Sequence, residues 1–214
     1  MTNDTDRATD GSTATTDGAD DGLAAYFGDR IAASIAAKQA LANQLGPSMA
    51  VGRAILASYQ AGGKLIVFGN GGSAADAQHI AAEFVGRFYI DRRALPAMAL
   101  NVNTSAVTAI GNDFGFDALF ARQVEAFGRP GDVALGLSTS GNSSNVVAGL
   151  CAAREGGLVT VALVGERGGK MAEYADHVVT VPSADTPRVQ ESHILLGHIW
   201  SEMVEQALFG TPTW

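Results

Sequence analysis

The chain has 214 residues, of which 47% are hydrophobic, and its formal net charge at pH 7 is -8. This length fits a single domain with a substantial core. No apolar run approaches the ~20 residues that cross a bilayer, so we expect no membrane partner. The N-terminus lacks the basic and apolar regions of a secretory signal. The one cysteine, Cys151, excludes an intrachain disulfide and is typical of the reducing cytoplasm, where we expect the protein to reside.

Most of the negative charge lies at the N-terminus. Residues 1–22 contain six aspartates and one arginine, so they carry -5 of the total and the rest of the chain carries -3. Met1 is the only apolar side chain larger than alanine in this stretch, which is too little to offset the entropy of ordering. We therefore predict a disordered acidic tail at 1–22 and a single domain at 23–214 that includes N-terminal helices. The body has no basic stripe, so nucleic acid is not an expected partner.

Beyond the tail, the pattern predicts two alanine-rich helices and then alternating strands and helices. The first two helices are predicted at Leu23–Leu45, ended by Gly46-Pro47, and at Ser48–Gln60. Short apolar strands are predicted at Lys64–Phe68, Ala97–Asn101, Val133–Leu137, Val159–Val164 and His177–Val181. Helices are predicted between most of them at Ala74–Val85, Ser105–Ile110, Ala118–Ala126, Ser143–Glu155 and Gly169–Tyr174, and a last one at Arg188–Leu208.

This alternation is typical of parallel strands joined by right-handed crossovers. The strands are apolar throughout, as in a sheet that helices cover on both faces. The predicted fold is α/β: a three-layer α/β/α sandwich of the flavodoxin-like kind, with a five-stranded parallel sheet preceded by a helical hairpin.

The loop after the first predicted strand resembles a phosphate-binding loop. Residues 69–74 (GNGGSA) satisfy the dinucleotide pattern G-x-G-x-x-G/A between a strand and a helix. That interpretation needs a carboxylate at the end of the second strand to hold the ribose. Asp91 precedes this strand, and the strand itself ends in Asn101. The loop alone leaves a dinucleotide and a smaller phosphorylated ligand both open.

A second polar loop follows the third predicted strand. Residues 138–144 (STSGNSS) contain five hydroxyl side chains and a glycine, and a helix begins there. One such side chain would suffice to cap the helix. Hydroxyls and free N–H groups at a helix N-terminus also form an anion site without a formal cation. Two polar loops at the carboxyl ends of parallel strands favour one small phosphorylated ligand, with no nucleotide cofactor.

Two helices supply candidate acid–base groups. His79 and Glu83 are four residues apart and share a helix face, either as an ordinary surface pair or as part of the site that the first loop begins. On the last helix, Gln190 and His198 follow one i±4 row. A carboxylate with an imidazole suits proton transfer between adjacent carbons of a sugar phosphate. The same four side chains are also compatible with a divalent metal such as zinc, and the two interpretations are not exclusive. We expect a structural role for His177, and for His193 either a structural role or one of supporting the catalytic residues from behind.

Four ordered segments, GNGGSAADAQH followed by Glu83, NDFGF, STSGNS and RVQESHILLGH, together resemble the phosphoheptose isomerases of the sugar isomerase (SIS) family. The resemblance covers the chain except for the tail. It implies a SIS fold and a homotetramer with active sites between subunits. The implied reaction is an aldose-ketose isomerisation of D-sedoheptulose 7-phosphate to D-glycero-D-manno-heptose 7-phosphate through an enediol, the first step of nucleotide-activated heptose biosynthesis.

The resemblance also implies roles for individual residues. Glu83 corresponds to the base that moves the proton between C1 and C2, and His198 to its acid/base partner. Arg87 corresponds to a residue that reaches a neighbouring subunit's site. The remaining implied substrate contacts are Asn70, Gly71, Gly72, Ser73, Asn112, Asp113, Ser138, Thr139, Ser140, Ser143 and Gln190. Some members carry one zinc ion on the residues that match His79, Glu83, Gln190 and His198. Pro187 stands where some members have an aspartate, so nearby Asp185 is the candidate to replace that carboxylate.

Two other functions fit the same scaffold. One is a non-catalytic SIS protein that binds the replication initiator, to which LPAMALN and VTAIGND are similar. That protein lacks the glutamate and the histidine that match Glu83 and His198, so their presence favours the enzyme. The other is a SIS isomerase of another sugar phosphate.

Overall fold

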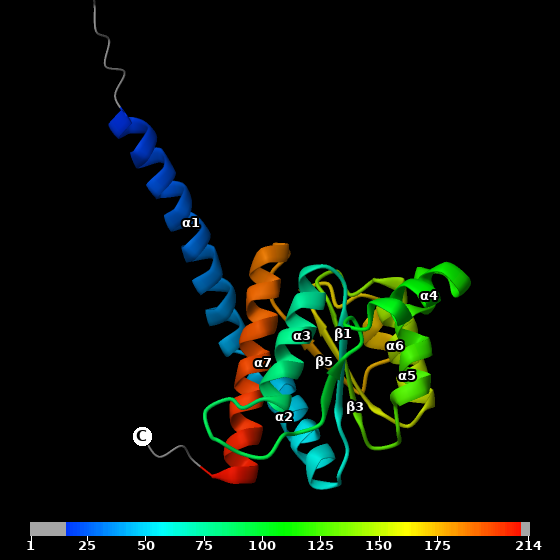
Figure 1. Cartoon of the computed structure of the whole chain (residues 1–214). Coiled ribbons are helices and arrows are strands. Elements are labelled where there is room, and N and C mark those ends of the chain that lie inside the picture. The colour runs from blue at the N-terminus through cyan, green and yellow to red at the C-terminus, as the bar shows by residue number, and fades with distance from the viewer. Residues whose placement is uncertain (1–15, 211–214) are drawn as a thin grey trace, which may run out of the picture.

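The structure is a computed structural model that describes residues 16–210 (Figure 1). Helix α1 spans Thr16–Ala42, so residues 16–22, predicted as part of the disordered tail, are helical instead. The composition of this stretch is typical of disorder, but residues 16–22 extend a helix that is already formed. Extending a helix costs far less free energy than nucleating one. The remainder of the predicted tail, residues 1–15, lies outside the described residues.

The break between the first two helices falls earlier than predicted. Helix α2 spans Leu45–Gln60, so Gly46 and Pro47 belong to its first turn and do not end α1. Proline is tolerated there because the first turn of a helix has no carbonyl partners for its N–H groups.

The predicted five-stranded parallel sheet is confirmed. Its strands are β1 (Leu65–Gly69), β2 (Ala97–Ala99), β3 (Val133–Ser138), β4 (Val159–Val164) and β5 (His177–Thr180). They lie in the order β2-β1-β3-β4-β5, and every neighbouring pair is parallel. This is the flavodoxin-like order of a doubly wound sheet.

Helices cover both faces of the sheet (Figure 1). On one face lie α2, α3 (Gly72–Val85) and α7 (Thr186–Phe209). On the other lie α4 (Thr104–Phe114), α5 (Leu119–Phe127), α6 (Ser144–Glu155) and the short 3-10 helices η1 (Phe116–Ala118) and η2 (Lys170–Glu173). The stretch predicted as a helix at Gly169–Tyr174 is therefore only a 3-10 turn.

Alternate residues of each strand divide the core into two layers. In β1, Leu65 and Val67 pack under α2, α3 and α7, whereas Ile66 and Phe68 pack under α5 and α6. All four are fully buried, which explains why the strand has no polar position.

The strand order places the two polar loops side by side. The chain leaves β1 towards one edge of the sheet and leaves β3 towards the other, so β1 and β3 form the topological switch point. Their carboxyl ends lead into the loops at residues 69–73 and 138–143, and ligands of such sheets bind in the crevice between loops of this kind. Among the described residues, no helix is long and apolar enough to span a bilayer.

Candidate active site

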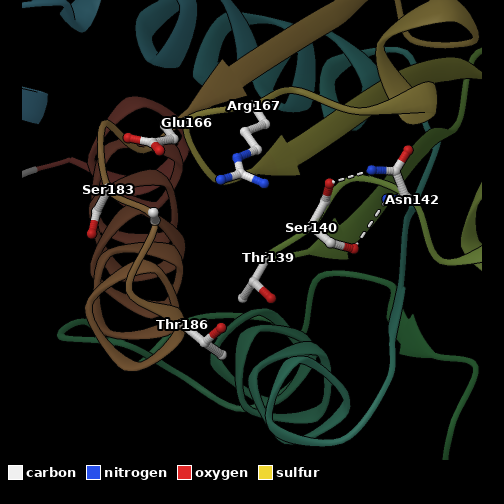
Figure 2. A pocket seen from close by; sticks show the side chains of 8 residues that line it. Thr139, Ser140, Asn142, Glu166, Arg167, Ser183 and Thr186 are labelled. Carbon is white, nitrogen blue, oxygen red and sulfur yellow. Dashed lines mark hydrogen bonds between the residues drawn. The ribbon is translucent and has the colours of Figure 1, made fainter.

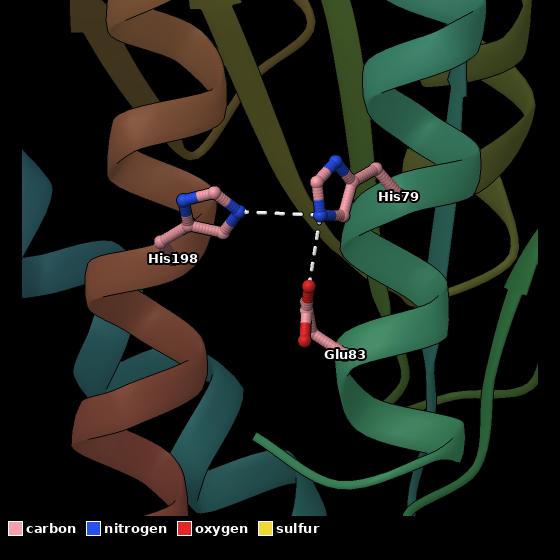
Figure 3. Close-up of side chains that lie close together, drawn as sticks. All are labelled: His79, Glu83 and His198. Atoms are coloured by element: carbon pink, nitrogen blue, oxygen red, sulfur yellow. Dashed lines mark hydrogen bonds and ion pairs between the residues drawn. The ribbon is translucent and has the colours of Figure 1, made fainter. Parts of the chain in front are cut away.

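Three titratable side chains meet between α3 and α7 (Figure 3). His79 Nε2 lies 2.8 Å from Glu83 Oε1 and 3.4 Å from His198 Nε2. Gly197 allows the helices to come this close, because a Cβ at that position would lie 2.5 Å from Ile80 Cγ1 on α3. The predicted sharing of one helix face by His79 and Glu83 is thus observed, and the last helix adds His198.

The cluster is open to solvent on one side and carries an available carboxylate. The side chain of His79 is 52% exposed and that of Glu83 is 20% exposed. Among the described residues, Glu83 Oε2 has no hydrogen-bond partner, whereas Oε1 is held by His79. A partly shielded carboxylate with one free oxygen is suited to accept a proton from a bound molecule.

The same three residues have the geometry of a metal site. One ligand atom from each of His79, Glu83 and His198 lies within 4.8 Å of the others. Two imidazoles and one carboxylate are the protein ligands of many catalytic zinc sites, in which a fourth position stays open. The donor set therefore fits zinc.

The hydroxyls of the second loop converge at the start of α6. Ser138 Oγ lies 2.9 Å from Ser143 Oγ and 3.3 Å from Ser140 Oγ. Ser143 is the N-cap residue, but its side chain makes no capping hydrogen bond. Its hydroxyl is thus directed to the loop, and the first N–H groups of α6 remain available to an anion.

A pocket of about 260 Å³ opens beside this loop, between it and the start of α7 (Figure 2). Thr139, Ser140 and Asn142 line one side, and Ser183, Ala184 and Thr186 line the other. Arg167 adds a cation, and Glu166 lies next to it. Sequence reasoning missed Arg167, which follows β4, and Ser183, which follows β5, although both strands end at the same edge of the parallel sheet.

Hydrogen bonds fasten the loop that carries Arg167 to the hydroxyl loop. Gly165 N donates to Thr139 O, and Met171 N donates to Gly141 O. Gly141 has a φ of +67°, and a Cβ there would lie 2.0 Å from Gly168 O, so only glycine allows this approach. The two loops therefore form one rigid wall of the pocket.

The first loop is fixed from both sides. Asn70 and Asn145 form a reciprocal amide pair, with N···O distances of 2.8 and 3.0 Å. Since this pair occupies the Asn70 side chain, a ligand would meet the loop mainly through its backbone. Ser73 is buried in the first turn of α3. Gln190 packs on Gly72, where a Cβ would lie 2.4 Å from Gln190 Nε2.

Several predicted site residues lie away from the acid–base cluster. Gln190 and His198 are roughly 12 Å apart along α7 at 1.5 Å per residue, and Gln190 sits level with the first loop. Asn112 and Asp113 hydrogen-bond to each other on α4, on the opposite side of the sheet from α3 and α7 (Figure 1). Arg87 is exposed just beyond the end of α3. Their roles in binding or in a metal site stay predictions.

Burial sets the protonation of two further groups near the site. It lowers the pKa of His193 to about 4, so this fully buried imidazole is neutral at physiological pH and packs as a core residue, as its predicted structural role requires. Burial also raises the pKa of Asp76 to about 6, against the opposing charge of His79.

Fold and site together define a class of protein. A flavodoxin-like sheet presents hydroxyl-rich loops at its switch point, and a Glu–His cluster lies on the neighbouring helices. A family model described as the SIS domain matches residues 27–165. The chain therefore belongs to the SIS domain family, and similar proteins include several named phosphoheptose isomerases.

These relatives match most of the chain. The phosphoheptose isomerase of Aneurinibacillus thermoaerophilus is 56% identical over 71% of this chain and 76% of its own length. That of Sulfurimonas denitrificans is 48% identical over 86% of this chain and 96% of its own length. The solved phosphoheptose isomerase of Neisseria gonorrhoeae is 44% identical, with a TM-score of 0.81, over 86% of this chain and 99% of its own.

Proposed function

We propose that the chain is a phosphoheptose isomerase that interconverts D-sedoheptulose 7-phosphate and D-glycero-D-manno-heptose 7-phosphate. The observation that carries this proposal is the meeting of Glu83 and His198 between α3 and α7, in a chain that also has a hydroxyl-lined phosphate-type loop. Glu83 and His79 are 2.8 Å apart, and His79 and His198 are 3.4 Å apart. The chain's similarity to named phosphoheptose isomerases supports the choice of substrate.

In the proposed reaction, Glu83 is the base. Its carboxylate removes a proton from C1 of the ketose, and the C1–H electrons form the C1=C2 bond of the enediolate while O2 takes the negative charge. His198 protonates O2 and accepts the proton of the C1 hydroxyl. As the C1 aldehyde forms, Glu83 returns its proton to C2. No external oxidant or reductant is needed, because C1 is oxidised as C2 is reduced.

Binding of the phosphate is assigned to the second loop. The hydroxyls of Ser138, Ser140 and Ser143 converge there, and the N-terminus of α6 adds N–H groups. Thr139 lines the adjoining pocket, where the positive charge of Arg167 favours an anionic ligand. The Asn70–Ser73 loop lies at the switch point, at the start of the helix that carries Glu83.

Zinc is proposed as a ligand of the acid–base cluster, held by His79, Glu83 and His198. When bound, it would polarise the substrate carbonyl as a Lewis acid. Glu83 Oε2 remains free to receive the substrate proton even while Oε1 faces His79.

The proposed assembly is a homotetramer with active sites between subunits. Helix α1 extends away from the body (Figure 1) and exposes an apolar row at every fourth residue, each more than half exposed: Leu23, Phe27, Ile31 and Ile35. Such a row on a projecting helix is typical of a contact with another copy. The distance of Asn112 and Asp113 from the cluster within one chain also fits a site completed by a second subunit.

The direct test is incubation with sedoheptulose 7-phosphate, followed by NMR. We expect the aldose 7-phosphate to accumulate to an equilibrium ratio, and fructose 6-phosphate to react far more slowly. Absence of conversion with zinc both present and removed would exclude the proposed activity. Equal conversion of the two ketoses would point instead to an isomerase of another sugar phosphate.

A further inference from the structure

A buried ion pair lies just outside the acid–base cluster. Arg92, in the segment between α3 and β2, donates from Nε to Glu205 Oε2 of α7 at 2.9 Å, and only 2% of each side chain is exposed. Desolvating two charges is expensive, so such a pair is retained only where further hydrogen bonds satisfy both partners. Arg92 and Glu205 each make such further hydrogen bonds.

Glu205 organises the backbone of the segment that follows α3. Its carboxylate accepts the N–H groups of Phe88, Tyr89 and Ile90 at distances of 2.9, 2.6 and 2.8 Å. Burial opposes the charge of Glu205, but these N–H groups and Arg92 outweigh burial and hold its pKa below the ordinary value. The carboxylate therefore stays charged and acts as the hydrogen-bond partner that this irregular segment would otherwise lack.

Arg92 caps the end of the helix that carries Glu83. Its Nη2 donates to Glu83 O at 2.9 Å, and its Nη1 donates to Phe84 O at 2.8 Å and Gly86 O at 3.1 Å. The last carbonyls of a helix have no intrahelical partners, and a positive charge there is favourable. The last turn of α3, which includes Glu83, is thus fixed by a side chain from outside the helix.

The same pair reaches the other side of the cluster through Phe88. The backbone of Phe88 is bonded to Glu205, and its ring lies 5.9 Å from the ring of His198. Glu205 and His198 belong to the same helix, α7. One buried ion pair is therefore bonded directly to the backbone of Glu83 and to the residue that packs on His198.

We propose that Arg92 and Glu205 form a positioning pair that sets the geometry of Glu83 relative to His198. Neither side chain contacts the proposed substrate site, so they act through the residues they hold. The inference rests on the proposed function, in which those two groups transfer protons. Misplacing reacting groups by about 1 Å can cost ~10²-fold in rate, which makes a rigid last turn of α3 important.

The test compares two conservative variants with wild-type protein. Glu205→Gln keeps the size of the side chain and removes its charge. Arg92→Lys keeps the charge but cannot reach Glu83 O and Glu205 together. For both, we expect kcat to fall about tenfold or more while KM stays within about twofold, because the phosphate loop is untouched. Arg92→Lys decides the question if Glu205→Gln does not fold.

A matched control separates positioning from stability. Lys64 and Asp132 form another largely buried ion pair, at the amino-terminal ends of β1 and β3, where Asp132 also accepts backbone N–H groups of Lys64 and Arg129. Asp132→Asn should lower the thermal stability much as Glu205→Gln does, but leave kcat unchanged. A loss of kcat in Asp132→Asn as large as in Glu205→Gln would overturn the inference.

A second measurement does not depend on turnover. We expect the imidazole NMR signals of His79 and His198 to shift in Glu205→Gln and Arg92→Lys but not in Asp132→Asn. Unchanged signals in the folded variants would contradict the positioning role, whether or not the wild-type protein isomerises sedoheptulose 7-phosphate. If the signals shift but wild-type protein is inactive, the proposed function fails and the positioning role stands.

Discussion

The seam between α3 and α7 and the hydroxyl loop after β3 are built in different ways. The seam carries titratable side chains on two helices that pack closely at Gly197. The loop carries hydroxyls and helix N–H groups, and the chain after β4 holds it by backbone hydrogen bonds. Groups that move protons are thus separated from groups that hold an anion. Changes in the seam should therefore affect kcat, and changes in the loop should affect KM.

The largest expected effect comes from Glu83→Gln in the seam. The amide cannot accept the C1 proton, so turnover should fall by at least the ~10²–10⁴-fold typical of a general base. Binding of inorganic phosphate, measured by calorimetry, should stay near the wild-type value because the loop is intact. Turnover close to that of wild type would remove Glu83 from the mechanism.

Breaking the apolar row of α1 tests whether the seam and the loop need a second subunit. Ile31→Glu with Phe27→Glu should dissociate the assembly, since charges would replace exposed apolar side chains at the contact. Light scattering after size exclusion measures the mass, and turnover should fall with it. Ala25→Glu changes the same helix away from the row and should leave the mass unchanged. An unaltered mass in the double variant would contradict the proposed role of α1.

A smaller effect is expected from one hydroxyl of the loop. Ser140→Ala removes a hydrogen bond to a charged ligand, worth about 1.5 kcal/mol or more, so KM should rise about tenfold with little change in kcat. Ser144→Ala is the matched control, because the Ser144 hydroxyl is bonded to Asp117. Steady-state kinetics of the two variants measure KM and kcat separately. A fall in kcat alone would contradict the division between loop and seam.

The smallest effect on activity, but a measurable one on stability, is expected from His193. Its folded pKa of about 4 lies below the unfolded 6.5, so the unfolded chain binds more protons in that window and stability falls as the pH drops from 6.5 to 4. Over this pH range, protonation of His193 lowers the free energy of unfolding by about 3 kcal/mol. Asp76, with a raised pKa, changes stability with pH in the opposite direction. The informative quantity is therefore the free energy of unfolding of wild-type protein minus that of His193→Gln, both measured by urea unfolding. A pH-independent difference would contradict the assignment.

Patterns that a single segment contains were predictable from the sequence. The apolar strands, the parallel sheet and the sharing of a helix face by His79 and Glu83 depend on spacing along the chain, and the structure contains them. Boundaries were less accurate where neighbouring residues compete, as at residues 16–22 and at Pro47.

Contacts between distant segments could not be predicted in the same way. Nothing local indicates that Arg167 faces the hydroxyl loop, or that Asn70 is paired with Asn145. The buried pair of Arg92 and Glu205 joins residues far apart in the sequence. In the sequence alone, each would be expected to be an ordinary charged residue on the surface. The two residues come together only when α7 packs on α3 in the folded chain.

The most direct test of the proton-transfer account follows sedoheptulose 7-phosphate in D₂O by NMR, with wild-type protein and Glu83→Gln side by side. If Glu83 carries the proton between C1 and C2, wild-type protein forms the aldose 7-phosphate with deuterium at C2, because the carboxyl proton exchanges with solvent in the enediol state. Glu83→Gln should form neither aldose nor deuterated ketose. Formation of the aldose by Glu83→Gln at the wild-type rate would contradict it.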